Sequence, residues 1–242
     1  MCGIVGYIGP REPQPLILEG LRRLEYRGYD SAGIATIDGG ALDVRKAAGK
    51  IAELEAELDR APLTGSVGIG HTRWATHGAP TTRNAHPHSD GSGRVALVHN
   101  GIIENHDILR TKLVELGHEF ESGTDTEVLC HLIEQVYDGN LEQAVRNALS
   151  EVQGTYGIAV ISADEPDRIV VARMGSPLIV GVGDGEYVIA SDASAIIEHT
   201  GRVVYLEDGE MAVASAAGFR TMTLDAVPVT KDVNEVEFSL EE

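Results

Sequence analysis

Five short apolar segments follow one another in the last third of the chain, and this series constrains the fold more than any other feature. Gly, Asp and Pro residues separate the segments, which span 158–162, 168–173, 178–182, 187–191 and 203–206. Apolar runs of this length between turn residues predict short strands in an antiparallel arrangement. The 28 glycines in 242 residues exceed the average share of about 7% and agree with many tight turns.

Helical patterns dominate the first two thirds of the chain, with strands between them. Predicted strands cover 3–8, 33–37, 67–74 and 94–99, the last of them ended by Asn100-Gly101. Predicted helices cover 13–24, 51–58, a segment from Asn105 to Gly117, a segment that begins at the capping-box spacing of Thr124–Glu127, and 141–152. These elements indicate one α+β domain over residues 1–242, with no internal linker or repeat. The acidic, glycine-free tail from about residue 230 to 242 is either an edge strand or a linker to a further domain.

Composition excludes several classes of partner. Nineteen basic residues against 38 acidic ones give a formal net charge of −19, so the surface repels phosphate backbones and we expect no nucleic-acid partner. There is no long apolar run and no secretory signal at the start of the sequence, so we expect no membrane span and a cytoplasmic location. Cys2 and Cys130 are too few for a disulfide scaffold or a thiolate zinc site. Cys130 is predicted to lie off the apolar stripe of its helix, and nothing marks it as reactive.

Cys2 is the first candidate nucleophile. Removal of Met1 would place a thiol and a free α-amine on one residue. The amine has a reference pKa of ~7.7–8.0 against ~8.5 for the thiol, so it is partly unprotonated near neutrality and can take the thiol proton. This is the N-terminal-amine form of an activated nucleophile. Taken alone, Cys2 fits better as a small apolar residue that opens a strand, and the rest of the sequence has to decide.

Asn100-Gly101 is the second candidate. As a dipeptide it is typical of a two-residue hairpin turn. An Asn carboxamide and a Gly N–H can also point together at a developing negative oxygen and form an oxyanion hole. The helix predicted after Asn105 argues against a simple hairpin.

Arg73, Trp74 and Asp125 are candidate ligand-binding residues. Arg can grip a carboxylate with two hydrogen bonds and Trp can cover a pocket, although a surface loop with a core tryptophan explains the pair equally well. Asp125 fits an acid in the first turn of a helix and can also bind an ammonium group. No HExxH or comparable spacing accompanies the histidines, so we expect no metal site and no cofactor; those considered are His71, His77, His86, His88, His99 and His106.

These features occur together in one family. The chain resembles the glutaminase domains of glutamine–fructose-6-phosphate amidotransferases, also called glucosamine-6-phosphate synthases. The matching stretches are Met1–Gly6, Arg22–Gly33, His71–Gly78, Asn84–His88, His99–Asn105, Thr124–Glu127, Arg173–Leu178 and Ala190–Asp192. The resemblance implies the N-terminal-nucleophile hydrolase fold, a four-layer αββα sandwich in which two antiparallel sheets lie between two helical layers.

The resemblance also implies roles for individual residues. Cys2 would be the nucleophile, with its own amine as base, and Asn100 and Gly101 would form the oxyanion hole. Arg73 would bind the α-carboxylate of glutamine and Asp125 its α-ammonium group. The other implied site residues are Thr76, His77 and Gly78 in a loop that closes over the substrate, Trp74 as a shield and ammonia gate, and His86 as a supporting residue.

The implied reaction is hydrolysis of the side-chain amide of free L-glutamine to glutamate and ammonia, through a γ-glutamyl thioester on Cys2. In this family a C-terminal sugar-isomerising region uses the ammonia to convert fructose 6-phosphate to glucosamine 6-phosphate. We expect that region to begin where this sequence ends, and the full-length protein to be a homodimer. The rival interpretations are the glutaminase domain of another class II amidotransferase (purine-pathway, asparagine-forming or glutamate-forming), a metal hydrolase, and a non-catalytic regulatory module if Met1 is retained.

Overall fold

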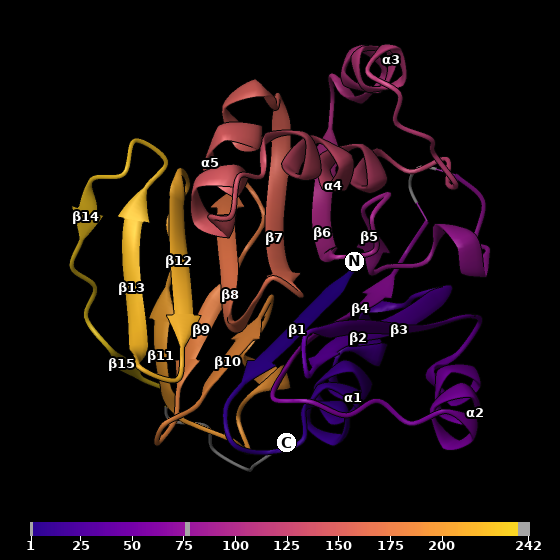
Figure 1. Cartoon of the computed structure of the whole chain (residues 1–242). Coiled ribbons are helices and arrows are strands. Elements are labelled where there is room, and N and C mark those ends of the chain that lie inside the picture. The colour runs from indigo at the N-terminus through magenta and orange to yellow at the C-terminus, as the bar shows by residue number, and fades with distance from the viewer. Residues whose placement is uncertain (1, 76–77, 237–242) are drawn as a thin grey trace.

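Two antiparallel sheets lie face to face in the computed structural model, which describes residues 2–75 and 78–236 (Figure 1). The first sheet has the strand order β15 (Asn234–Glu235), β11 (Arg202–Tyr205), β9 (Ile179–Val182), β10 (Tyr187–Ala190), β1 (Gly3–Ile8), β4 (Val67–Arg73), β2 (Ser31–Asp38) and β3 (Ala41–Ala48). The second has the order β14 (Pro228–Val229), β13 (Gly218–Thr223), β12 (Glu210–Ser215), β8 (Glu165–Met174), β7 (Gly154–Ser162), β6 (Val95–Ile103) and β5 (His88–Ser89). The antiparallel pairing predicted for the last third of the chain is confirmed.

Helices cover the outer faces of both sheets (Figure 1). α1 (Pro13–Arg23) and α2 (Ile51–Arg60) pack on the first sheet, and α4 (Asp125–Val136) and α5 (Leu141–Glu151) pack on the second. α3 (His106–Glu115) lies beside α4. Short 3₁₀ turns occur at η1 (Glu25–Arg27), η2 (Thr82–Asn84) and η3 (Ala193–Ala195). None of the helices formed by the described residues is long and apolar enough to span a membrane.

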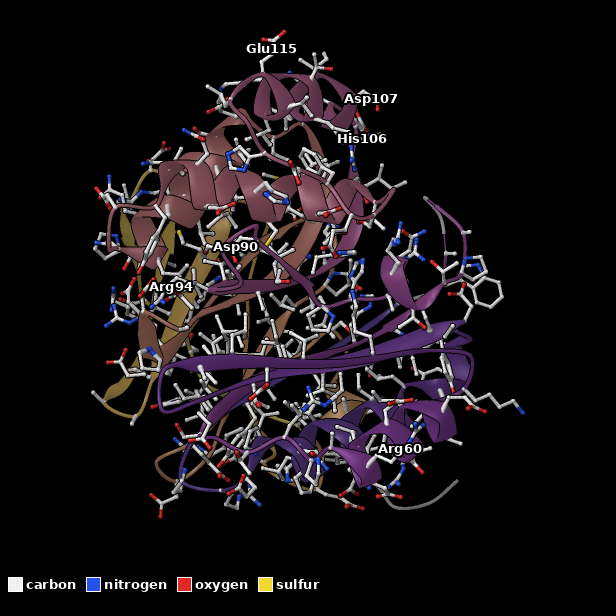
Figure 2. All side chains as sticks on the ribbon, turned by 45° about the vertical axis from the view of Figure 1, so that its right-hand side comes forward. Arg60, Asp90, Arg94, His106, Asp107 and Glu115 are labelled. Carbon is white, nitrogen blue, oxygen red and sulfur yellow. The ribbon has the colours of Figure 1, made fainter. Side chains whose placement is uncertain are left out.

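Three apolar layers hold these elements together in the described part of the chain. One lies between the two sheets, one between the first sheet and α1 with α2, and one between the second sheet and α4 with α5. Figure 2 shows the helical layers at opposite ends of the molecule, with Arg60 marking α2 and Glu115 marking α3. The helix–sheet–sheet–helix order confirms the α+β class and the αββα sandwich.

β1 shows why the sequence begins with an unbroken apolar run. Ile4 and Ile8 point into the layer between the sheets, whereas Val5 and Tyr7 point into the layer beneath α1. Successive side chains of a strand alternate between its faces, and both faces are covered here, so no polar position interrupts the strand. β1 therefore fixes Cys2, the residue just before it, at the end of a central, fully buried strand.

The prediction that Asn100-Gly101 ends a strand is wrong, and so is the hairpin alternative. β6 continues through both residues to Ile103, and Asn100 and Gly101 pair with Gly157 and Tyr156 of β7. Gly101 has φ = 132°, and a Cβ at this position would collide with the carbonyl oxygen of Thr155. Glycine is thus required for close pairing of two strands rather than for a turn.

The sequence predicts side-chain caps at the starts of two helices, α3 and α4, and only the cap of α4 is confirmed. Asn105 precedes α3 but makes no capping bond to it, because its amide instead donates to Glu151 O at 2.8 Å and accepts from Gln153 N at 3.0 Å. Thr124 does cap α4, since its hydroxyl accepts from Glu127 N at 3.2 Å. The Glu127 carboxylate does not reach back to Thr124 as in a full capping box, and accepts from Glu121 N and Ser122 N instead.

The sequence patterns do not predict β3, β12 and β13. β3 is a half-exposed edge strand with charged residues, and alanines form the face of β12 between the two sheets, so neither strand has a strong strand composition. Of the tail that was predicted as an edge strand or a linker, residues 234–235 form the edge strand β15.

Candidate active site

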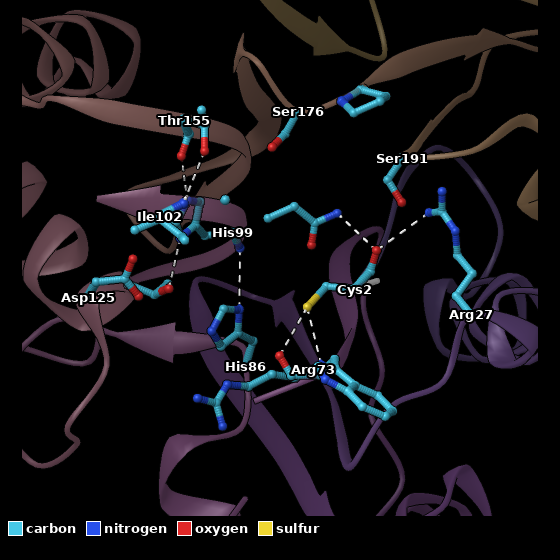
Figure 3. A pocket seen from close by; sticks show the side chains of 15 residues that line it. Cys2, Arg27, Arg73, His86, His99, Ile102, Asp125, Thr155, Ser176 and Ser191 are labelled. Carbon is cyan, nitrogen blue, oxygen red and sulfur yellow. Dashed lines mark hydrogen bonds between the residues drawn. The ribbon is translucent and has the colours of Figure 1, made fainter. Parts of the chain in front are cut away.

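Cys2 lies in a pocket of about 490 Å³ where the ends of the two sheets meet (Figure 3). Strand β1 of the first sheet brings Cys2 to the pocket, and β4 beside it brings Arg73 and the following Trp74. Strand β6 of the second sheet brings Asn100 and Gly101, and the start of α4 adds Asp125. Residues from three other parts of the sequence therefore line the pocket of the Cys2 thiol.

The Cys2 thiol is held by the backbone of Trp74. Trp74 N donates to Cys2 Sγ at 3.2 Å, and Sγ lies 3.6 Å from Trp74 O (Figure 3). Burial raises the pKa of the Cys2 thiol, while the Trp74 N–H and the charge of Arg73 oppose that rise. A raised pKa means that a neighbouring base has to take the proton before the sulfur can attack.

Asn100 stands between Cys2 and His71. Its Nδ2 donates to Cys2 O at 3.2 Å, and its Oδ1 lies 2.9 Å from His71 Nε2. Because an amide oxygen can only accept, this contact requires a proton on His71 Nε2. His71 thereby fixes which end of the amide faces Cys2, and His71 is a positioning residue.

A stack of buried, neutral histidines lies behind Asn100. His71 stacks on His86 with ring centroids 4.2 Å apart, and His86 Nδ1 accepts from His99 N at 3.4 Å. Burial lowers the pKa of His71 to about 3 and lowers the pKa of His86 well below its usual value. Because His71 and His86 are neutral, they add no positive charge behind Asn100. Arg73 is then the cation that lines the pocket together with Asp125.

Arg73 and Asp125 form the charged side of the pocket. Figure 3 shows the Arg73 guanidinium and the Asp125 carboxylate on the same side of the Cys2 thiol. Both residues are buried; Asp125 is held by Ile103 N, which donates to Oδ2 at 2.8 Å, and Arg73 Nη1 donates to Ala79 O at 3.4 Å. Burial lowers the pKa of Arg73, and the carboxylates of Asp30 and Asp125 oppose that shift. A cation and an anion that line one pocket match the two charges at the α-carbon of a free amino acid.

Trp74 also lines the pocket. Its side chain is 53% exposed and its ring packs over Gly28, where an added Cβ would lie 2.9 Å from Cζ3. Gly28 has φ = 75°, so this position favours glycine in conformation as well as in space. Next along the chain, Ala75 N donates to Asp30 Oδ2 at 2.6 Å and fixes the path of the backbone after β4.

The structure brings together most, but not all, of the predicted site residues. Those that line the Cys2 pocket are Cys2, Arg73, Trp74, His86, Asn100, Gly101 and Asp125. Gly78 is exposed and does not line the pocket among the described residues, and Thr76 and His77 lie outside those residues. The prediction that Cys130 lies off the apolar stripe of its helix is wrong, because Cys130 is fully buried in the apolar layer between α4 and the second sheet. Burial raises the pKa of the Cys130 thiol well above its usual value, which agrees with the prediction that nothing marks it as reactive.

Sequence reasoning missed several pocket residues. Arg27 donates from Nη1 to Cys2 O at 3.5 Å and pairs with Asp192 at 3.4 Å, and Ser191 Oγ accepts from Ile4 N at 3.0 Å. Arg27 and Ser191 lie in stretches that carry the family resemblance, which was the available signal. Thr155, Ser176 and Pro177 also line the pocket.

Two antiparallel sheets between helical layers, with a half-buried cysteine before a central strand and polar groups gathered around it, define the class of N-terminal-nucleophile hydrolases. A family model described as "Glutamine amidotransferase domain" matches residues 43–237. The chain belongs to this family of glutamine amidotransferase domains.

Individual relatives agree with this assignment. The chain is 55% identical to a glutamine–fructose-6-phosphate aminotransferase [isomerizing] of Chlorobaculum tepidum, and 50% identical to one of Pyrococcus horikoshii. Both matches cover 100% of this chain and 40% and 41% of the relatives, so the chain spans about two fifths of their length. It is also similar to the structure of glutamine phosphoribosylpyrophosphate amidotransferase from B. subtilis, with a TM-score of 0.79 and 30% identity over 92% of this chain and 49% of that one.

Proposed function

We propose that this chain hydrolyses the side-chain amide of free L-glutamine to glutamate and ammonia, with Cys2 as the nucleophile. The observation that carries the proposal is one pocket that is lined by the Cys2 thiol, the Asn100 amide and the opposite charges of Arg73 and Asp125. A nucleophile, an oxyanion donor and a grip for an amino acid are the three parts that an amidase acting on free glutamine requires.

The proposed reaction has two steps. Once Met1 is removed, the α-amine of Cys2 takes the thiol proton, and the sulfur attacks the amide carbon of glutamine. The negative oxygen rests on Asn100 Nδ2 and on Gly101 N–H until the C–N bond breaks; the amine proton goes to the leaving nitrogen, and ammonia departs. Water then attacks the γ-glutamyl thioester, which releases glutamate and restores the thiol.

The geometry suits a free amino acid better than a glutamine within a peptide. Arg73 would bind the α-carboxylate and Asp125 the α-ammonium group, and a peptide glutamine has neither charge. An amide nitrogen carries two hydrogens, so Asn100 can hold Cys2 O with one N–H and offer the other to the oxyanion. Trp74 would shield the bound substrate, and Thr76, His77 and Gly78 would form the loop that closes over it. His86 would support the site from behind Asn100.

The fate of the ammonia is a further part of the proposal. Two relatives that are at least 50% identical are named for the transfer of an amino group to fructose 6-phosphate, whereas the 30% identical structure is named for the phosphoribosylpyrophosphate reaction. We infer that residues 1–242 form a glutaminase unit whose ammonia serves a sugar-isomerising region in a full-length protein. A cytoplasmic location and a homodimer remain predictions.

An electrophilic glutamine analogue tests the mechanism directly. Protein whose intact mass shows loss of Met1 should release glutamate and ammonia from glutamine and should gain one adduct, located on Cys2 by peptide mass spectrometry. Cys2→Ala should lose both activity and labelling, whereas Cys130→Ala, the matched control, should keep both. Labelling at Cys130 alone, or glutaminase activity that survives in Cys2→Ala, would refute the proposal.

A further inference from the structure

Three metal-ligand atoms converge at a second place in the fold, on a face of α4 that does not line the Cys2 pocket. His118 Nδ1 and His131 Nδ1 lie 3.1 Å apart, and Glu134 Oε2 lies 3.3 Å from the first and 3.1 Å from the second. His131 and Glu134 are one turn apart on α4, and His118 comes from the segment between α3 and α4. The fold thus forms a nearly equilateral triangle from one carboxylate and two imidazoles.

The size of this triangle matches a tetrahedral metal ion. Zn²⁺ binds imidazole nitrogen and carboxylate oxygen at about 2.0–2.2 Å, which places neighbouring tetrahedral ligands about 3.3–3.5 Å apart. The three separations of 3.1–3.3 Å require only a small outward movement of the ligands. A set of two His and one Glu is also a known zinc ligand set that leaves a fourth position open.

The outer nitrogens of both rings point at acceptor oxygens, which turns the inner nitrogens toward one another. His118 Nε2 lies 2.8 Å from Gln135 Oε1, an oxygen that can only accept, so His118 Nε2 carries the proton. His131 Nε2 faces the Glu127 carboxylate at 3.8 Å. If both rings carry their proton on the outer nitrogen, both Nδ1 atoms present lone pairs to the Glu134 carboxylate, and one shared cation, a proton or a metal ion, has to lie among the three atoms. Outer-nitrogen contacts to a carboxylate or an amide oxygen are also the usual support of a metal-binding histidine, which favours the metal ion over the proton.

An ion can reach the triangle from solvent. A surface hollow of about 410 Å³ is lined by His118, His131 and Glu134, and also by Gly91 and Glu119. His131 is 2% exposed and forms the floor, while the side chains of His118 and Glu134 are 12% and 25% exposed and form the walls. The hollow leaves room for water or a buffer ligand in the fourth position.

We propose that His118, His131 and Glu134 bind one divalent transition-metal ion, with Zn²⁺ as the best match to the ligand set. The ion would tie the segment between α3 and α4 to α4 itself. Glu127, which faces His131, also accepts from Glu121 N and Ser122 N at 2.7 Å, so the metal would brace the turn that leads into Asp125. The sequence suggested no metal site because His118 stands 13 residues before His131 and no compact motif joins them.

Metal uptake by untagged, chelator-treated protein tests this site. Cys2→Ala serves as the background, since a thiolate in the Cys2 pocket is itself a zinc ligand. Titration with Zn²⁺ against a chromophoric chelator should show one ion per chain, Co²⁺ should give the visible absorption of a tetrahedral site, and Zn²⁺ should raise the melting temperature. No uptake of either ion by the folded, metal-free protein would overturn the proposal.

Two glutamate variants provide the matched comparison. Glu134→Gln removes a proposed ligand and should weaken Zn²⁺ binding by more than the ~10–100-fold that loss of a supporting contact costs. Glu119→Gln removes a carboxylate from the same hollow that is not one of the three converging ligands, and should leave Zn²⁺ affinity unchanged. Equal weakening in both variants would mean that negative charge alone attracts the ion, and would overturn the assigned geometry. Both glutamates are partly exposed, so both variants should fold.

Discussion

Replacement of Asn100 by Ala separates the chemical contribution of this residue from its structural one. The amide contacts Cys2 O at 3.2 Å through Nδ2 and His71 Nε2 at 2.9 Å through Oδ1. Loss of one oxyanion donor typically lowers kcat by about 10²–10³, or ~2.7–4 kcal/mol. KM for glutamine should change little, because Arg73 and Asp125 remain in place.

The same variant should also unfold more easily. It leaves the N–H of the fully buried His71 without its acceptor, which costs about 1–3 kcal/mol. For a chain of this size each kcal/mol lowers the melting temperature by about 2–4 °C. Asn105→Ala is the matched control, since its amide makes two backbone contacts outside the pocket. That variant should lose stability but keep kcat.

Glutamate release at saturating glutamine, measured with thermal unfolding of the same samples, distinguishes the two effects. The role of Asn100 as an oxyanion donor is refuted if folded Asn100→Ala loses less than about tenfold in kcat, which corresponds to about 1.4 kcal/mol. It is also refuted if Asn105→Ala loses as much activity as Asn100→Ala. Either result would show that the Asn100 amide does not stabilise the transition state.

Three further predictions follow from the pocket. His71→Phe should lower kcat by about tenfold, because it removes one hydrogen bond to Asn100. His71→Gln restores a donor and should recover part of that activity without a change in KM. Equal activity in the two variants would exclude the positioning role of His71. Gly28→Ala should cost about 1–2 kcal/mol through its positive φ and should shift the fluorescence of Trp74, the single tryptophan, whereas Gly93→Ala, with φ = 67° and open space around it, should leave the emission unchanged. Burial lowers the pKa of His71 to about 3, so below about pH 6.5 the unfolded state takes up a proton that the folded state does not bind. The free energy of unfolding should therefore fall by up to about 1.4 kcal/mol per pH unit between pH 6 and pH 3. Denaturant unfolding across this range should show a weaker dependence of stability on pH for His71→Phe, and an identical pH dependence would contradict the low pKa of His71.

Local signals predicted most of the secondary structure because the forces behind them act within one element. α1 follows from a proline at its start and apolar residues at helical spacing, and β1 follows from an apolar run that is buried on both faces. The prediction failed at Asn100-Gly101, where a strong turn signal was overridden by pairing with Gly157 and Tyr156 of β7. The partner strand lies more than fifty residues away, so no local pattern could report it.

For the candidate site too, the sequence predicts which residues take part but not how they are arranged. Cys2, Arg73, Asn100 and Asp125 could be named from their own chemistry and from the family resemblance, because nucleophiles, charges and oxyanion donors are properties of single side chains. The orientation of the Asn100 amide could not be named, because it depends on a hydrogen bond from β4 to β6 across two sheets. The convergence of His118 with His131 likewise exists only after α3 and α4 have packed. Residue type can thus be read along the chain, whereas distances between groups far apart in the sequence arise only when the layers close on one another.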